Sequence, residues 1–136
     1  MADKPTLLST PIDFERTGKQ CDYLKVPHSV HRSAYGWLPV PLVCVKNGEG
    51  PTVLLSSGVH GDEYEGQITL CNLIRDMEPE EVTGRVIILP MANFSAAKAG
   101  LRNSPIDQLN LNRVFPGDAD GTPTLALAHY IDSVLL

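Results

Sequence analysis

The chain has 136 residues, of which 43% are hydrophobic and 20% are charged, as is typical of a soluble globular protein with one usable core. Its net charge of −5, without a stripe of Lys and Arg, argues against binding to nucleic acid and to an anionic membrane surface. Cys21, Cys44 and Cys71 are odd in number and widely spaced, which disfavours a disulfide framework or a thiolate zinc site.

The amino-terminal sequence has no apolar signal region, and no run approaches the length of a membrane span, about 18–20 apolar residues. We therefore expect a cytoplasmic protein. Residues 1–37 form an irregular or edge-strand segment, and residues 38–136 carry the core. Strand composition over 38–45 is interrupted by Pro39 and Pro41, which indicates an edge strand or the start of a strand.

A strand, a helix and a second strand follow in close succession. The apolar run 51–58 predicts a strand buried on both faces, and 85–91 predicts another. Between them, 63–77 has apolar residues at helical spacing, so one face of a helix should pack on the sheet. The helical face comprises Ile68, Leu70, Cys71, Leu73, Ile74 and Met77. This βαβ order predicts parallel strands with a right-handed crossover.

The last part of the chain alternates helices and a long polar loop. A short helix over 94–100 should end at Gly100, and a helix should run from Pro123 to the end with Thr122 as its N-cap. The connection 101–121 is long enough to be a functional loop. Together the elements predict an α/β fold with a mostly parallel sheet flanked by helices.

The stretch GVHGDEYEG (58–66) stands where the first buried strand ends. Ligands in open α/β sheets bind beyond the carboxyl ends of the strands. His60 and Glu63 can face one cation from a tight turn, and imidazole with carboxylate suits zinc. The alternative is that Glu63 merely starts the helix and His60 is a turn residue.

A second polar group lies in the loop 101–121. Arginine binds a carboxylate with a two-pronged fork, so Arg102 and the pair Asn112–Arg113 indicate an anionic substrate or a developing oxyanion. The alternative is that these arginines pair with acidic residues of the same loop, namely Asp107, Asp118 or Asp120.

The combination of HGDEYEG, SPID, NLNRVFPGDADGT and the βαβ order resembles the zinc carboxypeptidase superfamily. Within it, the chain is most similar to the succinylglutamate desuccinylase/aspartoacylase family, in particular its N-acetyl-diaminobutyrate deacetylases. Leu109 and Leu125 depart from that pattern, where Gly and Glu are expected. The resemblance implies a three-layer zinc-carboxypeptidase-like (phosphorylase/hydrolase-like) fold, incomplete at its carboxyl-terminal end.

The resemblance also implies roles for individual residues. His60 and Glu63 correspond to two zinc ligands, Arg102 to a catalytic arginine that polarises the substrate carbonyl, and Asn112 with Arg113 to the pair that binds the α-carboxylate. The implied reaction is hydrolysis of an N-acyl, chiefly N-acetyl, amino acid by a zinc-activated water. The third zinc ligand, a histidine in an Asp-x-His-Ser/Thr-Gly segment, and the general-base glutamate are expected outside this chain.

Three other histidines are not expected to replace that ligand: His28, His31 and His129. We therefore expect residues 1–136 to form the amino-terminal part of one catalytic domain with negligible activity alone. A domain that binds carboxylate or metal without turnover is the alternative. Homo-oligomerisation through exposed apolar surface is a further possibility.

Overall fold

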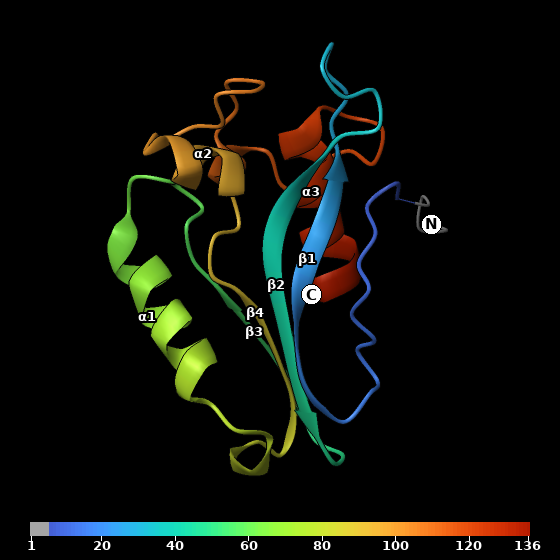
Figure 1. The fold of residues 1–136 in the computed structure, drawn as a ribbon, viewed down its shortest axis with the longest axis vertical. Coiled ribbons are helices and arrows are strands. Elements are labelled where there is room, and N and C mark those ends of the chain that lie inside the picture. Colours follow the sequence, from blue (N-terminus) through green and yellow to red (C-terminus); the bar gives the residue numbers. More distant parts are fainter. Residues whose placement is uncertain (1–5) are drawn as a thin grey trace.

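The computed structural model describes residues 6–136, whose strands form one mixed sheet (Figure 1). The strands β1 (Gly18–Pro27), β2 (Trp37–Asn47), β3 (Thr52–Ser56) and β4 (Gly84–Leu89) lie in the order β1-β2-β4-β3. β3 and β4 are parallel, as the βαβ pattern predicts, whereas β1–β2 and β2–β4 are antiparallel. The prediction of a mostly parallel sheet is therefore wrong, because strands outside the βαβ unit supply the other pairs.

The amino-terminal half contains more strand than its composition indicates. β1 lies within the segment predicted to be irregular or an edge strand, and it occupies the edge of the sheet. β2 is internal, which contradicts an edge position for 38–45, yet it pairs with β4 only from Val43 to Asn47. Pro39 and Pro41 precede that stretch. Their lack of an N–H group therefore costs no hydrogen bond to β4.

β3 is the other edge of the sheet. Its sequence predicts burial on both faces, but Thr52, Val53 and Ser56 are exposed and Val53 retains 45% of its accessible surface. The prediction of a doubly buried strand is wrong for these residues because no strand described here pairs with the outer side of β3.

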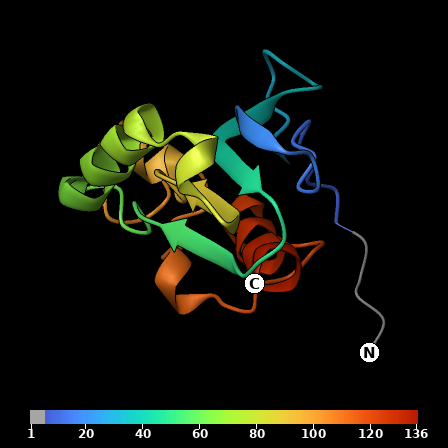
Figure 2. The ribbon, with the colours of Figure 1, turned by 90° about the horizontal axis from the view of Figure 1, so that it is seen from below.

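Two helices lie against opposite faces of the sheet (Figures 1 and 2). They are α1 (Tyr64–Asp76) and α3 (Pro123–Tyr130), the latter continued by a π-helical turn, η3 (Ile131–Leu135). The short α2 (Phe94–Ala99) and the 3₁₀ turns η1 (Pro79–Glu81) and η2 (Leu111–Arg113) complete the elements. Over residues 6–136, helices are too short or too polar to traverse a bilayer.

The two faces of the sheet bury different helices. On one face, Leu24 and Leu42 of the sheet and Leu127 of α3 belong to a large apolar cluster. This cluster contains most of the buried residues of α3 and η3. On the other, Ile88 lies in a smaller cluster that receives the predicted helical face of α1 only in part. Leu70, Leu73, Ile74 and Met77 pack there. Ile68 and Cys71, predicted to belong to the same face, are exposed.

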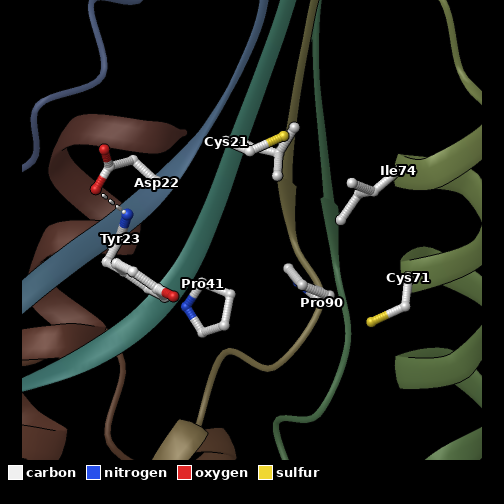
Figure 3. A pocket seen from close by; sticks show the side chains of 8 residues that line it. Cys21, Asp22, Tyr23, Pro41, Cys71, Ile74 and Pro90 are labelled. Carbon is white, nitrogen blue, oxygen red and sulfur yellow. Dashed lines mark hydrogen bonds between the residues drawn. The ribbon is translucent and has the colours of Figure 1, made fainter.

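An open groove of about 350 Å³ separates α1 from the β1–β2 half of this face. Figure 3 shows Cys71 and Ile74 on the α1 side, with Cys21, Tyr23 and Pro41 on the strands opposite. α1 therefore covers β3 and β4 but not the whole sheet, which explains why Cys71 remains exposed.

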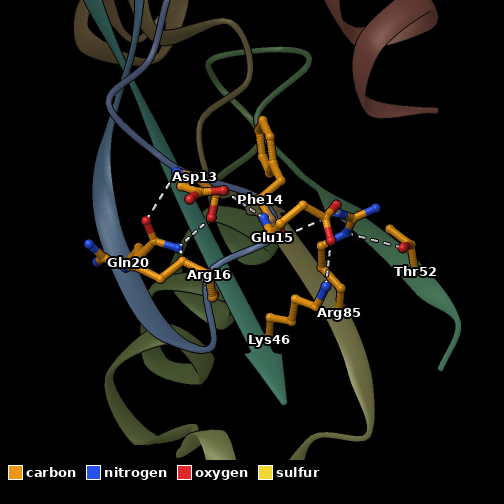
Figure 4. Close-up of polar contacts among 8 residues, drawn as sticks. All are labelled: Asp13, Phe14, Glu15, Arg16, Gln20, Lys46, Thr52 and Arg85. Carbon is orange, nitrogen blue, oxygen red and sulfur yellow. Dashed lines mark hydrogen bonds and ion pairs between the residues drawn. The ribbon is translucent and has the colours of Figure 1, made fainter. Parts of the chain in front are cut away.

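An exposed ion-pair cluster ties the amino-terminal segment to the sheet (Figure 4). The Glu15 carboxylate accepts from Lys46 Nζ at 2.5 Å and from Arg85 Nη1 at 2.6 Å. The same guanidinium group donates to the Phe14 carbonyl at 3.1 Å and, through Nε, to Thr52 Oγ1 at 3.1 Å. Because Lys46 is in β2 and Arg85 in β4, residue 15 is held where these strands pair.

The start of α3 is capped from a distance. Thr122 occupies the predicted N-cap position but makes no side-chain cap bond. Instead, Asp107 accepts from the Thr124 N–H at 2.9 Å and from its hydroxyl at 2.8 Å. Burial raises the pKa of Asp107, but hydrogen bonds from Thr122, Thr124 and Ser104 outweigh it and hold the pKa below its ordinary value. Asp107 thereby anchors the loop 101–121 on α3.

Candidate functional site

The carboxyl ends of β3 and β4 bring two polar loops together. Beyond the last paired residues, the Ser57 N–H donates to the Leu89 carbonyl at 3.0 Å, and the Ala92 N–H donates to the Ser57 carbonyl at 2.8 Å. The Asn93 N–H then donates to the Gly58 carbonyl at 3.0 Å. These bonds extend the parallel pairing past the sheet, so the loop that carries His60 runs alongside the start of α2.

Two glycines let the loop turn beside α2. Gly58 has a φ of +65°, a left-handed conformation that favours glycine. Gly61 is needed for space, since a Cβ there would lie 2.1 Å from the carbonyl carbon of Ala96. The loop is therefore pressed against the backbone of α2, and this contact fixes the height of His60 above the sheet.

Gln67 holds the same loop from α1. Its side chain is buried, and its Nε2 donates to the Gly61 carbonyl at 3.1 Å and to the Glu63 carbonyl at 2.9 Å. Because Gln67 is one turn into α1, it joins the first turn of the helix to the loop before it. Glu63 is the N-cap residue of α1, but its side chain makes no cap bond, so the carboxylate is available for other contacts.

His60, Glu63 and Arg102 meet at this edge. His60 Nδ1 lies 2.9 Å from Glu63 Oε1, and Arg102 Nη1 donates to the same oxygen at 3.3 Å. The His60 side chain is 9% exposed, whereas those of Glu63 and Arg102 are 59% and 55% exposed. The site thus has a fixed imidazole at its base and two charged groups at its mouth. Of the acidic loop residues offered as alternative partners, Asp107 bonds the Leu109 N–H and Thr124, whereas Arg102 bonds Glu63.

The exposed residues Asn112 and Arg113 lie in η2, next to these residues but not in the same cluster of bonds. Arg113 Nη1 donates to the Asn112 carbonyl at 3.3 Å. The link between η2 and the site is Asn110, whose Oδ1 lies 3.2 Å from His60 Nε2. The structure therefore brings His60, Glu63 and Arg102 into contact and places Asn112 and Arg113 one turn away.

The geometry of His60 and Glu63 fits a zinc ion. Tetrahedral zinc has ligand bonds of about 2.0–2.2 Å, so two ligand atoms lie about 3.4 Å apart. The observed 2.9 Å between Nδ1 and Oε1 would need to widen only slightly. The far nitrogen of the ring is already hydrogen-bonded, as is usual for histidine ligands. Within residues 6–136, however, no three His, Cys, Asp or Glu side chains cluster closely enough to hold a metal ion.

Sequence patterns did not reveal Asn110 or Gln67. Asn110 is the first asparagine of NLNR, a motif in which the resemblance assigns roles only to Asn112 and Arg113. A signal was present, since a polar residue before a short helical turn is a common N-cap. Gln67 looks like an ordinary polar helix residue in the sequence, and only the folded loop shows that it is buried and bonds the Gly61 and Glu63 carbonyls.

Comparison with known proteins identifies the family of this chain. Residues 49–135 match the family model described as the succinylglutamate desuccinylase/aspartoacylase catalytic domain. The chain belongs to this family. Among its curated members, N-alpha-acetyl-L-2,4-diaminobutyric acid deacetylase of Halomonas elongata is 50% identical over 133 residues. That alignment covers 98% of this chain and 39% of the relative.

Two solved members of the succinylglutamate desuccinylase/aspartoacylase family have the same fold. A product-bound structure of the ectoine utilization protein EutE (DoeB) from Ruegeria pomeroyi aligns with a TM-score of 0.95 and 47% identity, over 98% of this chain and 41% of that protein. A family protein from Rhodobacter sphaeroides aligns with a TM-score of 0.90 and 51% identity, over 94% of this chain and 39% of that one. The chain therefore spans about two fifths of the length of these relatives.

Proposed function

We propose that this chain forms part of the catalytic site of a zinc-dependent hydrolase that cleaves the amide bond of an N-acyl amino acid. The convergence of His60, Glu63 and Arg102 beyond the parallel strands carries the proposal. The relative from Halomonas elongata, a deacetylase of N-acetyl-diaminobutyrate, favours acetyl as the acyl group and a diamino acid as the remainder.

His60 and Glu63 are the proposed zinc ligands. A bound zinc ion supplies Lewis acidity that polarises a carbonyl and lowers the pKa of a water molecule. His60 is suited to hold it because its ring is buried and its far nitrogen is fixed. Glu63 adds a negative charge that the cation needs. A catalytic zinc usually has three protein ligands, so the proposal includes a further donor beyond these two.

Arg102 is the proposed catalytic cation. In the structure it donates to Glu63 Oε1 at 3.3 Å, and its exposed side chain can swing from this oxygen toward a substrate. A guanidinium group placed there would stabilise the negative charge that develops on the carbonyl oxygen when the amide is attacked. Its charge also offsets that of Glu63 when the site is empty of substrate.

Asn112 and Arg113 are the proposed carboxylate site. They are exposed on η2, and Asn110 ties that turn directly to His60. An arginine fork with a neighbouring amide matches the planar α-carboxylate of an amino acid. This arrangement would hold the substrate by the end that does not react and so orient its acyl group toward Arg102 and the metal.

The test is acetate release from N-acetyl-L-2,4-diaminobutyrate by the protein that contains this chain, with zinc added. We expect His60→Ala to abolish release and to remove zinc binding. His31→Ala is the matched control, because His31 is exposed in the β1–β2 connection. Undiminished hydrolysis by the His60 variant would refute the proposal. Zinc and carboxylate binding without hydrolysis would favour a binding protein instead.

A further inference from the structure

A hollow of about 540 Å³ lies between α2 and the start of β2. Its walls are apolar and rich in rings, with Trp37 and Pro39 from β2, Phe94 from α2, and Pro105 and Ile106 from the loop 101–121. Figure 1 shows α2 beside β2, at one end of the sheet. The volume falls within the range of about 300–1,000 Å³ that small-molecule sites occupy. This Trp37 hollow therefore has the size and the lining of a site for a small organic molecule.

The helix α2 separates the Trp37 hollow from the loop of His60. Four of the six residues of α2 line the hollow, namely Phe94, Ser95, Lys98 and Ala99. The other two, Ala96 and Ala97, present their backbone to Gly61. Successive residues of a helix are turned by about 100°, so these two sets lie on opposite sides of α2. The hollow is thus a separate place in the fold and not an extension of the proposed metal site.

The rim of the Trp37 hollow is positively charged. Lys98 is exposed there, and none of the lining residues that the structure describes is acidic. Among residues 6–136, Lys98 has no ion-pair partner. On the β-strand side, Lys25 Nζ lies 5.0 Å from the centroid of the Trp37 ring. Residues 23–48, which include most of β1 and β2, contain three Lys or Arg and no Asp or Glu. In a chain of net charge −5, this local excess of positive charge favours an anionic ligand.

The aromatic side chains at the hollow retain surface that a ligand can cover. Trp37 is 42% exposed, and the neighbouring Tyr23 is 45% exposed, with 6.2 Å between the two ring centroids. Aromatic rings pack well on one another in offset or edge-to-face arrangements. An aryl ring in the hollow would therefore gain ring contacts with Trp37 and Phe94 while apolar surface is removed from water.

We propose that the Trp37 hollow binds a small aromatic anion, an aryl ring that carries one carboxylate or sulfonate group. The ring lies among the aromatic and proline side chains, and the anionic group lies at the rim beside Lys98. The inference goes beyond the proposed hydrolase, because no residue that lines the hollow is a proposed metal ligand or substrate contact.

Anilinonaphthalene sulfonate is a suitable probe, because it combines aromatic rings with one negative charge. Phenylnaphthylamine has the same rings without the sulfonate and is the matched neutral probe. Trp37 is the only tryptophan of the 136-residue chain, so its indole N–H gives a single NMR signal of this kind. We expect this signal to shift on titration with either probe, and nuclear Overhauser contacts to connect the probe rings with the indole.

Substitutions at the rim test the role of charge. Lys98→Met keeps an unbranched apolar side chain but removes the ammonium group, and it should weaken binding of the sulfonate by about 2–5-fold, as for an exposed ion pair. Binding of the neutral probe should not change. Lys98→Arg should retain the affinity for the sulfonate, and Arg16→Met, which removes an exposed cation elsewhere, is the matched control. Ala99→Glu should weaken binding of the sulfonate through like-charge repulsion, whereas Ala99→Gln should not. Amide spectra of each variant report whether the fold is retained.

Several results would overturn the proposal. One is an equal effect of Lys98→Met on both probes, or no effect on either. Another is the absence of contacts between the bound probe and Trp37. An apparent affinity that fell as the chain concentration rose would show that a second copy covers the hollow instead. Loss of binding in His60→Ala would place the probe on the other side of α2. None of these measurements involves zinc or hydrolysis, so the result is independent of the proposed function.

Discussion

Gly61→Ala is the sharpest test of how the site loop is held. The added Cβ would lie 2.1 Å from the Ala96 carbonyl carbon and 2.2 Å from the Ala97 nitrogen. Since real Cβ contacts essentially never fall below 3.0 Å, the loop and α2 must separate by roughly 0.9 Å. The obstacle is helix backbone that cannot rotate away. Overpacking of this kind costs about 1–3 kcal/mol and occasionally more, and we expect at least the upper end.

Urea unfolding followed by circular dichroism measures this loss of stability, and Gly48→Ala is its control. Gly48 has a φ of +68° and no atom within 4 Å of an added Cβ, so its replacement carries only the conformational cost of about 1–2 kcal/mol. Gly61→Ala should unfold at a lower urea concentration than Gly48→Ala and should bind zinc less tightly. If Gly61→Ala were as stable as Gly48→Ala or more stable, and its zinc affinity were unchanged, the close contact between the loop and α2 would be refuted.

Further predictions concern residues that hold the site or the fold. Gln67→Met should cost about 1–3 kcal/mol, because two loop carbonyls lose a buried donor, and zinc titration should show weaker binding; unchanged urea unfolding would contradict this. The pKa of Asp107 is lowered by folding, so its carboxylate contributes stability above the unfolded-state pKa, and this is lost as pH falls through the folded-state pKa. The free energy of unfolding should therefore decrease as the pH is lowered below about 4, and it should decrease less steeply in Asp107→Asn. If the wild type and the variant lost stability in parallel with pH, the Asp107 cap would not contribute. Glu15→Gln should lower the urea midpoint at low salt only, because its ion pairs are exposed; a difference that persisted at about 1 M salt would show that packing is responsible instead.

The βαβ unit was the most predictable part of the fold. The helix predicted over 63–77 is observed as Tyr64–Asp76, and the predicted end at Gly100 is confirmed by its left-handed φ of +65°. Local patterns are sufficient here, because a helical period and a glycine stop are properties of neighbouring residues. Which strand becomes an edge was not predictable in this way, as β2 and β3 show, since it depends on pairings between distant segments.

The same division applies to the site. His60 and Glu63 are close in sequence, so their meeting in one turn could be predicted from their spacing, and the strand-end rule predicted that Arg102 lies at the same edge. The shared cation stays a prediction. Asn110 stands fifty residues from His60, and their contact at 3.2 Å depends on the folded loop. The assignment of Asn112 and Arg113 to a substrate carboxylate stays a prediction, as does homo-oligomerisation.

The edge position of β3 has a consequence for the chemistry. No strand within residues 6–136 pairs with the outer side of β3, and edge strands are where sheets recruit further chains. β3 leads directly into the loop of His60 and Glu63, and a hollow of about 370 Å³ lined by Ser56, Val59 and Glu63 lies where it ends. Any polypeptide that extended the sheet there would pass beside His60 and Glu63, the proposed metal ligands, so assembly at this edge and metal affinity would be linked through this loop.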